Sequence, residues 1–200
     1  MFTGIIQSVG TVQKAEIKKE GILLTVQAPK LFSKIKKGAS IAVNGVCLTV
    51  TKKNLKEKTF LVDVMPETIK KSNLGNLKKN SLVNLEQSLG AQDLIDGHFV
   101  LGHVDTTGKV TEISPSGNSY LLKIQASNPL YYIAKKGSVA LNGISLTVID
   151  FTSQSFRVGI IPYTWKNTML HSLRVGDRVN IEFDILAKYI KRIIKGASSK

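Results

Sequence analysis

One strand-like phrase occurs twice in this chain of 200 residues, and the repeat extends through most of its length. KKGASIAVNGVCLTV over 36–50 is matched by KKGSVALNGISLTV over 135–148. Further pairs follow in the same order: MFTGIIQSVGTV with FVLGHVDTTGKV, VDVMPETIKKSNL with VGIIPYTWKNTML, and VNLE with VNIE. Because the markers keep their order in both halves, they indicate a duplicated unit of about 90 residues. The chain is therefore predicted to fold as two similar units.

Each unit contains short runs rich in β-branched residues and separated by turn signals, a pattern typical of strands. In the first unit these runs cover 22–28, 40–43, 46–50, 59–65 and 82–86. The pairs Asn-Gly at 44–45 and at 142–143 each lie between two such runs, which is the strongest local signal for a β-hairpin. Each unit has about six short strands, and a closed antiparallel barrel would leave no strand edge unpaired, so a small barrel is favoured.

A helix is indicated clearly only at the end of the chain. Its apolar residues follow the spacing i, i+3, i+4, i+7, i+8: Leu186, Tyr189, Ile190, Ile193 and Ile194. Gly196 is predicted to end this helix. We expect units at 1–93 and 94–185, with the seam in LGAQDLIDG, and a helix and tail at 186–200. The stripe would pack either on its own barrel or, as the sharper prediction, against helices of sister chains.

The charge of the chain raises the question of nucleic-acid binding. The net charge is +14, yet only four of the 28 basic residues are Arg, which leaves 28 − 4 = 24 Lys. Base recognition favours Arg, and single-strand binding favours stacking aromatics, which make up 6% of this sequence. A solvated, lysine-rich surface is the simpler interpretation, so no nucleic-acid partner is predicted; weak attraction to anionic ligands stays open.

Targeting and cofactor signals are missing from the sequence. The start, MFTGIIQSVGTVQK, lacks the basic and apolar regions of a signal peptide, and no apolar run approaches about 18 residues. The single cysteine, Cys47, excludes an internal disulfide and suits a reducing compartment. No P-loop or G-x-G-x-x-G motif is present. We therefore expect a cytoplasmic protein that has no membrane partner.

The three histidines do not suggest a metal site. His98 and His103 are five residues apart, so they would face opposite sides of a strand and miss the i, i+4 alignment of a helical zinc pair. No second cysteine and no carboxylate cluster completes a ligand shell. No metal is predicted, and His171 is expected at the surface.

Alternation along a strand divides the repeated phrase into two faces. The bulky aliphatic residues are expected in the barrel interior: Val46, Leu48, Val50, Ile144, Leu146 and Val148. The small polar residues would then lie on the outer wall: Cys47, Thr49, Ser145 and Thr147. An exposed thiol is unusual, because cysteine is commonly buried. Cys47 is thus either a small filler under a loop or part of a shallow site that a partner subunit covers.

Glycines near these segments could leave backbone groups open to a flat ligand. They are Gly4, Gly45, Gly102 and Gly143.

Taken together, the motifs resemble those of the riboflavin synthase family, the lumazine-dismutating enzymes of flavin biosynthesis. The resemblance covers Met1 to about Lys195 and is carried by MFTGII, GASIAVNGVCLTV, VDVMPETIKKSNLG, VNLE, GHFVLGHVD, KGSVALNGISLTV, IIPYT and VNIEFD. It implies an all-β fold of two tandem, homologous, six-stranded, antiparallel Greek-key-like β-barrels plus a C-terminal α-helix that holds a homotrimer. An association with lumazine synthase is a further possibility that it leaves open.

The resemblance also implies a reaction. Two molecules of 6,7-dimethyl-8-ribityllumazine would bind between the N-barrel of one subunit and the C-barrel of its neighbour. A four-carbon unit would pass from one to the other, giving riboflavin and 5-amino-6-ribitylamino-uracil without cofactor or metal. Two nearly identical pockets suit two identical substrates, and the exchange of Cys47 for Ser145 would make one substrate the donor and the other the acceptor.

By position, the resemblance assigns substrate-binding residues to each barrel. The N-barrel pocket would use Gly4, Ile5, Ile6, Cys47, Leu48, Thr49, Asp63, Val64, Met65, Pro66, Glu67 and Thr68. The C-barrel pocket would use Gly102, His103, Val104, Lys136, Ser145, Leu146, Thr147, Ile161, Pro162, Tyr163, Thr164, Trp165 and Lys166.

The catalytic candidates are a smaller set. Histidine exchanges protons near neutral pH, so His103 is the predicted proton carrier. The residues that match the family's candidates for placing the nucleophile and stabilising charge are Cys47, Ser40, Ser145, Thr147 and Asp184. Which of them performs which step stays open.

Two positions depart from the family pattern. Asn142 stands where many members have Asp, and Asp96 stands where many have Gly. An asparagine can form hydrogen bonds but cannot serve as a base. Trp165 could stack on a ligand or equally pack against a barrel. Two other classes of protein remain as alternatives: a non-catalytic carrier of lumazine or flavin with the same fold, and a basic RNA-binding tandem barrel.

Overall fold

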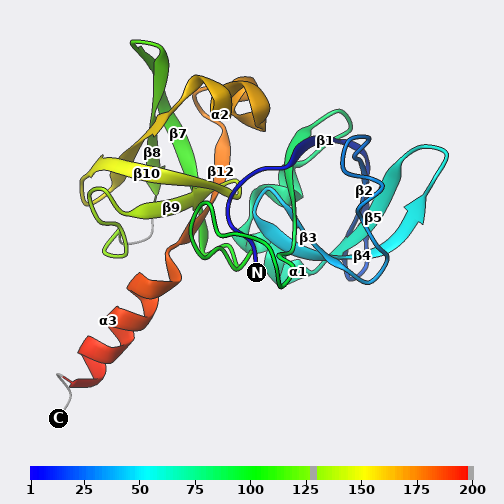
Figure 1. Ribbon diagram of the computed structural model, residues 1–200, viewed down its shortest axis with the longest axis horizontal. Helices are drawn as coiled ribbons and strands as arrows, with labels where there is room; N and C mark the ends of the chain where they lie inside the picture. The colour runs from blue at the N-terminus through cyan, green and yellow to red at the C-terminus, as the bar shows by residue number, and fades with distance from the viewer. Residues whose placement is uncertain (127–129, 198–200) are drawn as a thin grey trace.

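The computed structural model describes residues 1–126 and 130–197, and it contains two barrels of the same topology (Figure 1). The first barrel consists of β1 (Ser8–Lys18), β2 (Gly21–Gln27), β3 (Ser40–Val43), β4 (Val46–Asn54), β5 (Thr59–Val64) and β6 (Leu82–Gln87). The second consists of β7 (Thr106–Ser116), β8 (Ser119–Ala126), β9 (Ser138–Leu141), β10 (Ile144–Phe151), β11 (Ser155–Ile160) and β12 (Arg178–Phe183).

Both barrels close in the same way. The strand order is β1-β2-β5-β4-β3-β6 in the first, and β10-β11-β8-β7-β12-β9 in the second is the same cyclic arrangement. Every pairing between these strands is antiparallel. The predicted all-β fold of two six-stranded antiparallel barrels and a C-terminal helix is confirmed.

The two faces of the repeated phrase are also as predicted. Val46, Leu48 and Val50 of β4 are buried in the first core, as are Ile144, Leu146 and Val148 of β10 in the second. Thr49 and Thr147 are exposed, and Cys47 and Ser145 are half-buried on the outer wall. The burial of the aliphatic face fixes which side chains can reach a ligand.

The predicted hairpins are present as well. Asn44 and Gly45 have φ values of 47° and 75°, and Asn142 and Gly143 have 45° and 78°. Positive φ at both central residues is the mark of the type I′ turn that Asn-Gly favours.

Besides the predicted C-terminal helix, the structure contains two short helices that the sequence pattern did not indicate. Each barrel has a six-residue helix after its fifth strand, α1 (Pro66–Lys71) and α2 (Pro162–Asn167), followed by a 3-10 turn, η1 (Asn73–Asn76) or η2 (Met169–Ser172). Proline begins both helices, where its missing N–H costs nothing. Six residues are too few to show a helical period in the sequence.

The two hairpin tips meet where the barrels touch. A methyl group built on Gly45 would lie 2.6 Å from the nitrogen of Gly143. The Asn84 side-chain amide donates to the Asn142 carbonyl over 2.9 Å, and that of Asn180 donates to the Asn44 carbonyl over 2.8 Å. Gly45 and Gly143 therefore let two backbones approach each other; the idea that they expose backbone to a flat ligand was wrong.

The departure at Asn142 has a structural explanation here. Its side chain is fully buried, and its Oδ1 accepts from the Asn180 N–H at 2.8 Å and from the Asn73 amide at 3.1 Å. Its amide nitrogen contacts the sulfur of Met169 at 3.3 Å. Asn142 thus fastens elements of both barrels.

The leading segments of the two barrels cross between them. Phe2 and Val100 form a bridge, with Phe2 N donating to the Val100 carbonyl at 2.7 Å and Val100 N to the Phe2 carbonyl at 3.1 Å. Both side chains are buried in a small cluster with Ala42 of β3 and Ala140 of β9. Figure 1 accordingly shows the N-terminus at the junction of the two barrels.

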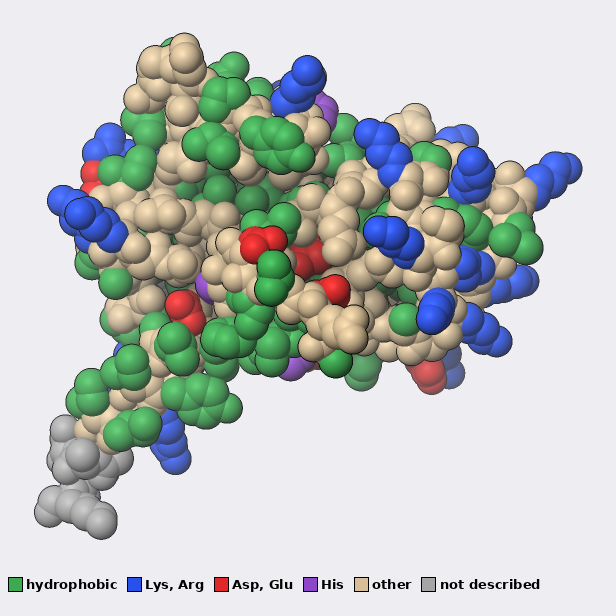
Figure 2. Space-filling model, viewed as in Figure 1, with side chains coloured by type: hydrophobic (Ala, Val, Ile, Leu, Met, Phe, Trp, Pro, Cys, Tyr) green, Lys and Arg blue, Asp and Glu red, His purple; other side chains and the backbone are tan. Residues whose placement is uncertain are grey.

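The last helix, α3 (Ile185–Ala197), extends away from both barrels (Figure 1). Its base is held by an ion pair of 2.6 Å between Lys188 and Asp105. The predicted stripe stays exposed, from 57% at Leu186 to 69% at Ile193, and forms an apolar surface along the helix in Figure 2. The helix continues one residue past Gly196; residues 198–200 of the predicted tail lie outside the described residues. No helix in the described part is long and apolar enough to cross a membrane.

Candidate functional site

The first candidate groove lies on the outer wall of the first barrel, around Cys47. A cavity of about 150 Å³ is lined by Val46, Cys47, Glu67, Thr68, Lys71, Ser72, Gly102, His103 and Val104. The Cys47 N–H donates to the Gly102 carbonyl over 2.9 Å, which adds the segment 102–104 to the free side of β4. A methyl group built on Gly102 would lie 2.6 Å from the Cys47 Cβ, so only glycine allows this approach.

The equivalent place on the second barrel, around Ser145, has the same backbone contacts and is called the second groove. The Ser145 N–H donates to the Gly4 carbonyl over 2.8 Å, and a methyl group on Gly4 would lie 2.7 Å from the Ser145 Cβ. Ile6 packs against the core of the second barrel, just as Val104 packs against that of the first.

This geometry corrects the assignment of the pockets to barrels. The Gly4 carbonyl and the Ile6 side chain lie against the second barrel, although the Gly4 N–H is held by Glu86 of the first. Gly102, His103 and Val104 line the cavity at Cys47 of the first barrel. The assignment failed because it kept residues with their own repeat unit. The crossing of the leading segments exchanges these pieces between the units.

Sequence reasoning missed His98. Its Nδ1 lies 2.7 Å from the Ser145 hydroxyl oxygen. Burial lowers the pKa of the His98 imidazole below its ordinary value, and the negative charge of Asp184 opposes part of that shift. The second groove therefore brings together a serine, a largely neutral histidine and a carboxylate. His98 was considered only as a metal ligand, so it was overlooked that the pair Gly-His occurs twice in the segment GHFVLGH, at 97–98 and at 102–103.

The two grooves differ in more than Cys47 and Ser145. In the repeat alignment of VDVMPETIKKSNL with VGIIPYTWKNTML, Asp63 corresponds to Gly159 and Glu67 to Tyr163. Asp63, Glu67 and Tyr163 are all exposed. Of the two carboxylates, Glu67 lines the cavity at Cys47 together with exposed His103, and the repeat puts Tyr163 at the matching position of the second barrel.

Lys136 has an unusual backbone. Its φ is 66°, and its N–H donates to the Val148 carbonyl over 2.8 Å, next to Thr147. The first barrel has Gly38 at the matching place, with φ 82° and its N–H bonded to Val50. A lysine thus occupies a position where glycine would be the unstrained choice.

The other predicted residues differ in burial and position. Leu48, Val64 and Leu146 are buried in the barrel cores, so only their backbone can face a ligand. Ser40 is half-buried and lies opposite Thr49 in the β3–β4 pairing. The residues from the ends of β5 and β11 into α1 and α2 are mostly exposed: Met65, Pro66, Ile161, Pro162 and Lys166. Thr68 and Thr164, inside α1 and α2, are half-buried, and exposed Ile5 follows Gly4 beside Ser145.

Trp165 packs within its own barrel. Its ring stacks on Tyr120 with centroids 4.1 Å apart and an interplanar angle of 18°. His171 is exposed, with Nδ1 2.6 Å from the Thr168 carbonyl oxygen. Within residues 1–126 and 130–197, no three His, Cys, Asp or Glu side chains are grouped so that they could hold a metal ion.

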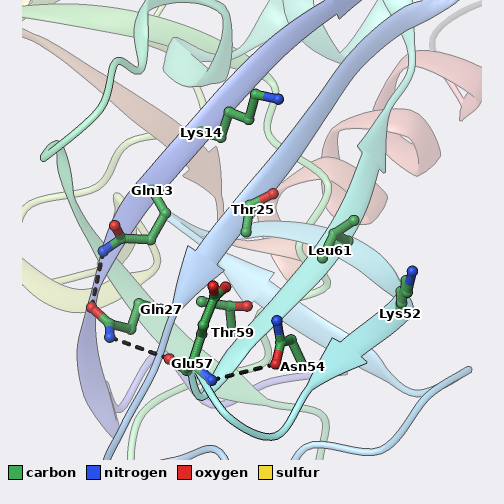
Figure 3. A pocket seen from close by; sticks show the side chains of 9 residues that line it. All are labelled: Gln13, Lys14, Thr25, Gln27, Lys52, Asn54, Glu57, Thr59 and Leu61. Atoms are coloured by element: carbon green, nitrogen blue, oxygen red, sulfur yellow. Dashed lines mark hydrogen bonds between the residues drawn. The ribbon is translucent and has the colours of Figure 1, made fainter.

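A larger cavity of about 620 Å³ lies elsewhere on the first barrel (Figure 3). Its lining contains no predicted site residue: Gln13, Lys14, Thr25, Gln27, Lys52, Asn54, Glu57, Thr59 and Leu61. Register shifts between Val12 and Lys14 and between Val50 and Lys52 distort the strands on two sides of it. The Gln13 side-chain amide donates to Gln27 Oε1 over 2.9 Å, and that of Gln27 donates to the Glu57 backbone carbonyl over 3.2 Å.

Comparison with known proteins identifies the fold family. The model of the lumazine binding domain matches residues 3–88 and 101–184. Among solved structures, LumP in complex with riboflavin superposes with a TM-score of 0.85 at 22% identity, covering 92% of this chain and 99% of LumP. LumP in complex with 6,7-dimethyl-8-(1'-D-ribityl) lumazine gives 0.83 at 21% identity, covering 91% and 98%. Fold and domains together define a tandem lumazine-binding-domain protein.

Sequence relatives narrow the class further. Riboflavin synthase of Actinobacillus pleuropneumoniae is 47% identical over 195 residues, covering 97% of this chain and 90% of the relative. Those of Bacillus subtilis and Schizosaccharomyces pombe are 40% and 35% identical, covering 99% and 98% of this chain and 92% and 94% of theirs. The chain belongs to the riboflavin synthase family of enzymes.

Proposed function

We propose that the protein converts two molecules of 6,7-dimethyl-8-ribityllumazine into riboflavin and 5-amino-6-ribitylamino-uracil, as a homotrimer in the cytoplasm. The observation that carries the proposal is the pair of matching outer-wall grooves, which differ at the position of Cys47 and Ser145. A reaction between two identical molecules needs two similar pockets that treat their occupants differently.

The site is proposed to form between the first groove of one subunit and the second groove of its neighbour. The cavity at Cys47, about 150 Å³, is smaller than the roughly 300–1,000 Å³ usual for a ligand site, so a second wall is required. The exposed stripe of α3 supplies an apolar surface through which chains can associate. Stacking two heterocycles in one such space would lower the barrier by up to about 7–11 kcal/mol through orientation alone.

Polar groups would then serve the proton transfers and the addition of a nucleophile. His103 beside Cys47 is proposed to exchange a proton at the first groove, and His98 to do so at the second through the Ser145 hydroxyl. Ser40 and Thr49, with Thr147 and Lys136 opposite, are proposed to orient the ribityl chains through hydrogen bonds. Asp184 is proposed to stabilise positive charge near His98.

A complementation experiment tests the shared site. His103→Gln should disable the first groove and Ser145→Ala the second, so each variant alone should turn over slowly. In randomly mixed trimers, about one site in four would combine two intact grooves, and about a quarter of the wild-type rate should return. The rate is followed as riboflavin fluorescence, and each variant refolded with itself is the control. No recovery on mixing would contradict a site shared between subunits.

The same assay separates the enzyme from a carrier. The LumP structures, whose titles name bound riboflavin and lumazine, make a non-catalytic carrier the second candidate. A carrier would hold the added lumazine without forming riboflavin. If Cys47→Ser, His103→Gln and Ser145→Ala all kept the wild-type rate, the assignment of the grooves would be wrong.

A further inference from the structure

The repeated motifs VNLE and VNIE end in carboxylates that the proposed reaction does not use. Glu86 closes the motif in β6 and Glu182 closes it in β12, and each is only 3% exposed. An ionised carboxylate is costly to bury unless hydrogen bonds satisfy its oxygens. The partners of both carboxylates therefore indicate what they are for.

Glu86 binds the leading segment of the chain. Its Oε1 accepts from the Thr3 N–H at 2.6 Å and from the Thr3 hydroxyl at 2.8 Å, and its Oε2 accepts from the Gly4 N–H at 3.1 Å. The Gly4 carbonyl then accepts from the N–H of Ser145. A carboxylate of the first barrel thus fixes the backbone that lies against Ser145, in the groove of the second barrel.

Glu182 does the same in the opposite direction. Its Oε1 accepts from the Leu101 N–H at 2.6 Å and its Oε2 from the Gly102 N–H at 2.9 Å. The Gly102 carbonyl accepts from the N–H of Cys47, and His103 follows directly. A carboxylate of the second barrel therefore fixes the backbone that covers Cys47, in the groove of the first barrel.

Two opposing effects act on the protonation of both groups. Burial raises the pKa of Glu86 and of Glu182, and the N–H donors oppose that rise. Both oxygens of each carboxylate accept from N–H groups, so a proton on either oxygen would face a donor. The bonds are complete only in the ionised form.

We propose that Glu86 and Glu182 are crossed positioning residues. Glu182 aligns Gly102 and His103 over Cys47, and Glu86 aligns Gly4 and the following Ile5 and Ile6 along Ser145. Each carboxylate thereby shapes the groove of the barrel to which it does not belong. As far as substrate is concerned, this inference rests on the proposed function, since it assumes that the two grooves hold the lumazines.

The thiol of Cys47 provides a test that needs no substrate. It is the only cysteine in the chain, so its reaction with a coloured disulfide reagent is unambiguous. Glu182→Gln keeps the shape of the side chain, but an NH2 group replaces one of the two acceptor oxygens. This donor would then face a backbone N–H, which is also a donor. It should loosen the segment over Cys47 and raise the labelling rate roughly tenfold. Glu86→Gln, the matched control in the other copy, should leave the rate within about twofold of wild type.

The second readout is complementation. Glu182→Gln should behave as a first-groove variant and regain activity with Ser145→Ala, whereas Glu86→Gln should regain it with His103→Gln. Equal labelling rates in both glutamine variants would overturn the crossed assignment and leave a general structural role. Should a glutamine variant fail to fold, Glu182→Asp and Glu86→Asp keep the charge, shorten the reach, and must show the same asymmetry. Asymmetric labelling in a protein that forms no riboflavin would leave the positioning intact and reject the proposed function.

Discussion

Replacing Gly45 with alanine should weaken the protein at the contact between its barrels. The residue has φ 75°, and the added methyl group would lie 2.6 Å from the nitrogen and 2.8 Å from the Cα of Gly143. The left-handed backbone costs an alanine about 1 kcal/mol, and forced overpacking typically adds about 1–3 kcal/mol. The barrels would have to separate, which would also stretch the hydrogen bonds that the side-chain amides of Asn84 and Asn180 donate across the junction. We expect a total loss of about 2–4 kcal/mol of unfolding free energy.

Gly38 provides the matched control for this experiment. It has nearly the same backbone, with φ 82°, but a methyl group there would meet nothing within 4 Å. Gly38→Ala should therefore cost about 1 kcal/mol, the backbone term alone. Urea unfolding measures both variants, with circular dichroism for the whole chain and fluorescence of Trp165, the single tryptophan, for the second barrel. Equal losses in the two variants would refute the reasoning, because the clash with Gly143 would then have no energetic consequence.

Three further outcomes are expected. Burial keeps the pKa of His98 below its ordinary value of 6.5, so acidification through the lowered pKa should protonate His98 and reduce turnover. The variant His98→Gln should be slow at all pH values, and its pH–rate profile should lack this acidic limb. An unchanged acidic limb in the variant would exclude His98 as its source. Because the pKa of Glu86 is raised above 4.5, the native state binds the Glu86 proton more tightly than the unfolded chain does. The contribution of Glu86 to stability should therefore fall as pH rises from 4.5 through the raised pKa. The difference in unfolding free energy between wild type and Glu86→Gln, measured with urea at several pH values, should show that slope, and a slope of opposite sign would contradict it. Removing residues 186–200 should shift the mass in solution from trimer to monomer and abolish riboflavin formation, whereas a fully active monomer would refute the shared groove.

The parts of the fold that sequence reasoning predicted are those fixed by local chemistry. Alternation places Cys47 and Thr49 opposite Leu48 on a strand whatever the rest of the chain does. Asn44-Gly45 favours one turn type for similarly local reasons. The stripe of α3 could be predicted from its period, because the spacing of apolar residues along one helix is a local property of the sequence.

The exchange between the barrels was beyond such reasoning. The hydrogen bond between Gly4 and Ser145 joins residues that are far apart in the chain. No local sequence pattern indicates against which of the two barrels the leading segment packs. A signal was nevertheless present: an acidic residue ends an apolar strand in both repeats, at Glu86 and Glu182. A buried carboxylate needs donors, and the adjacent glycine-containing segments supply them. His98 was missed because it was weighed only as a metal ligand, while the acid–base role was given to His103 alone.

The exchange has a consequence for how one duplicated fold can run an asymmetric reaction. After the crossing, His103 lies at the groove of Cys47, while His98 lies at the groove of Ser145, although both come from the single segment GHFVLGH. A segment shared in this way gives each groove one histidine. The two barrels differ at matching positions of the repeat, with Asp63 and Glu67 in the first barrel and Gly159 and Tyr163 in the second. Neither unit on its own contains a complete groove, since residues 1–93 lack the segment that covers Cys47. A substitution in one leading segment therefore changes the surroundings of the wall that belongs to the other barrel.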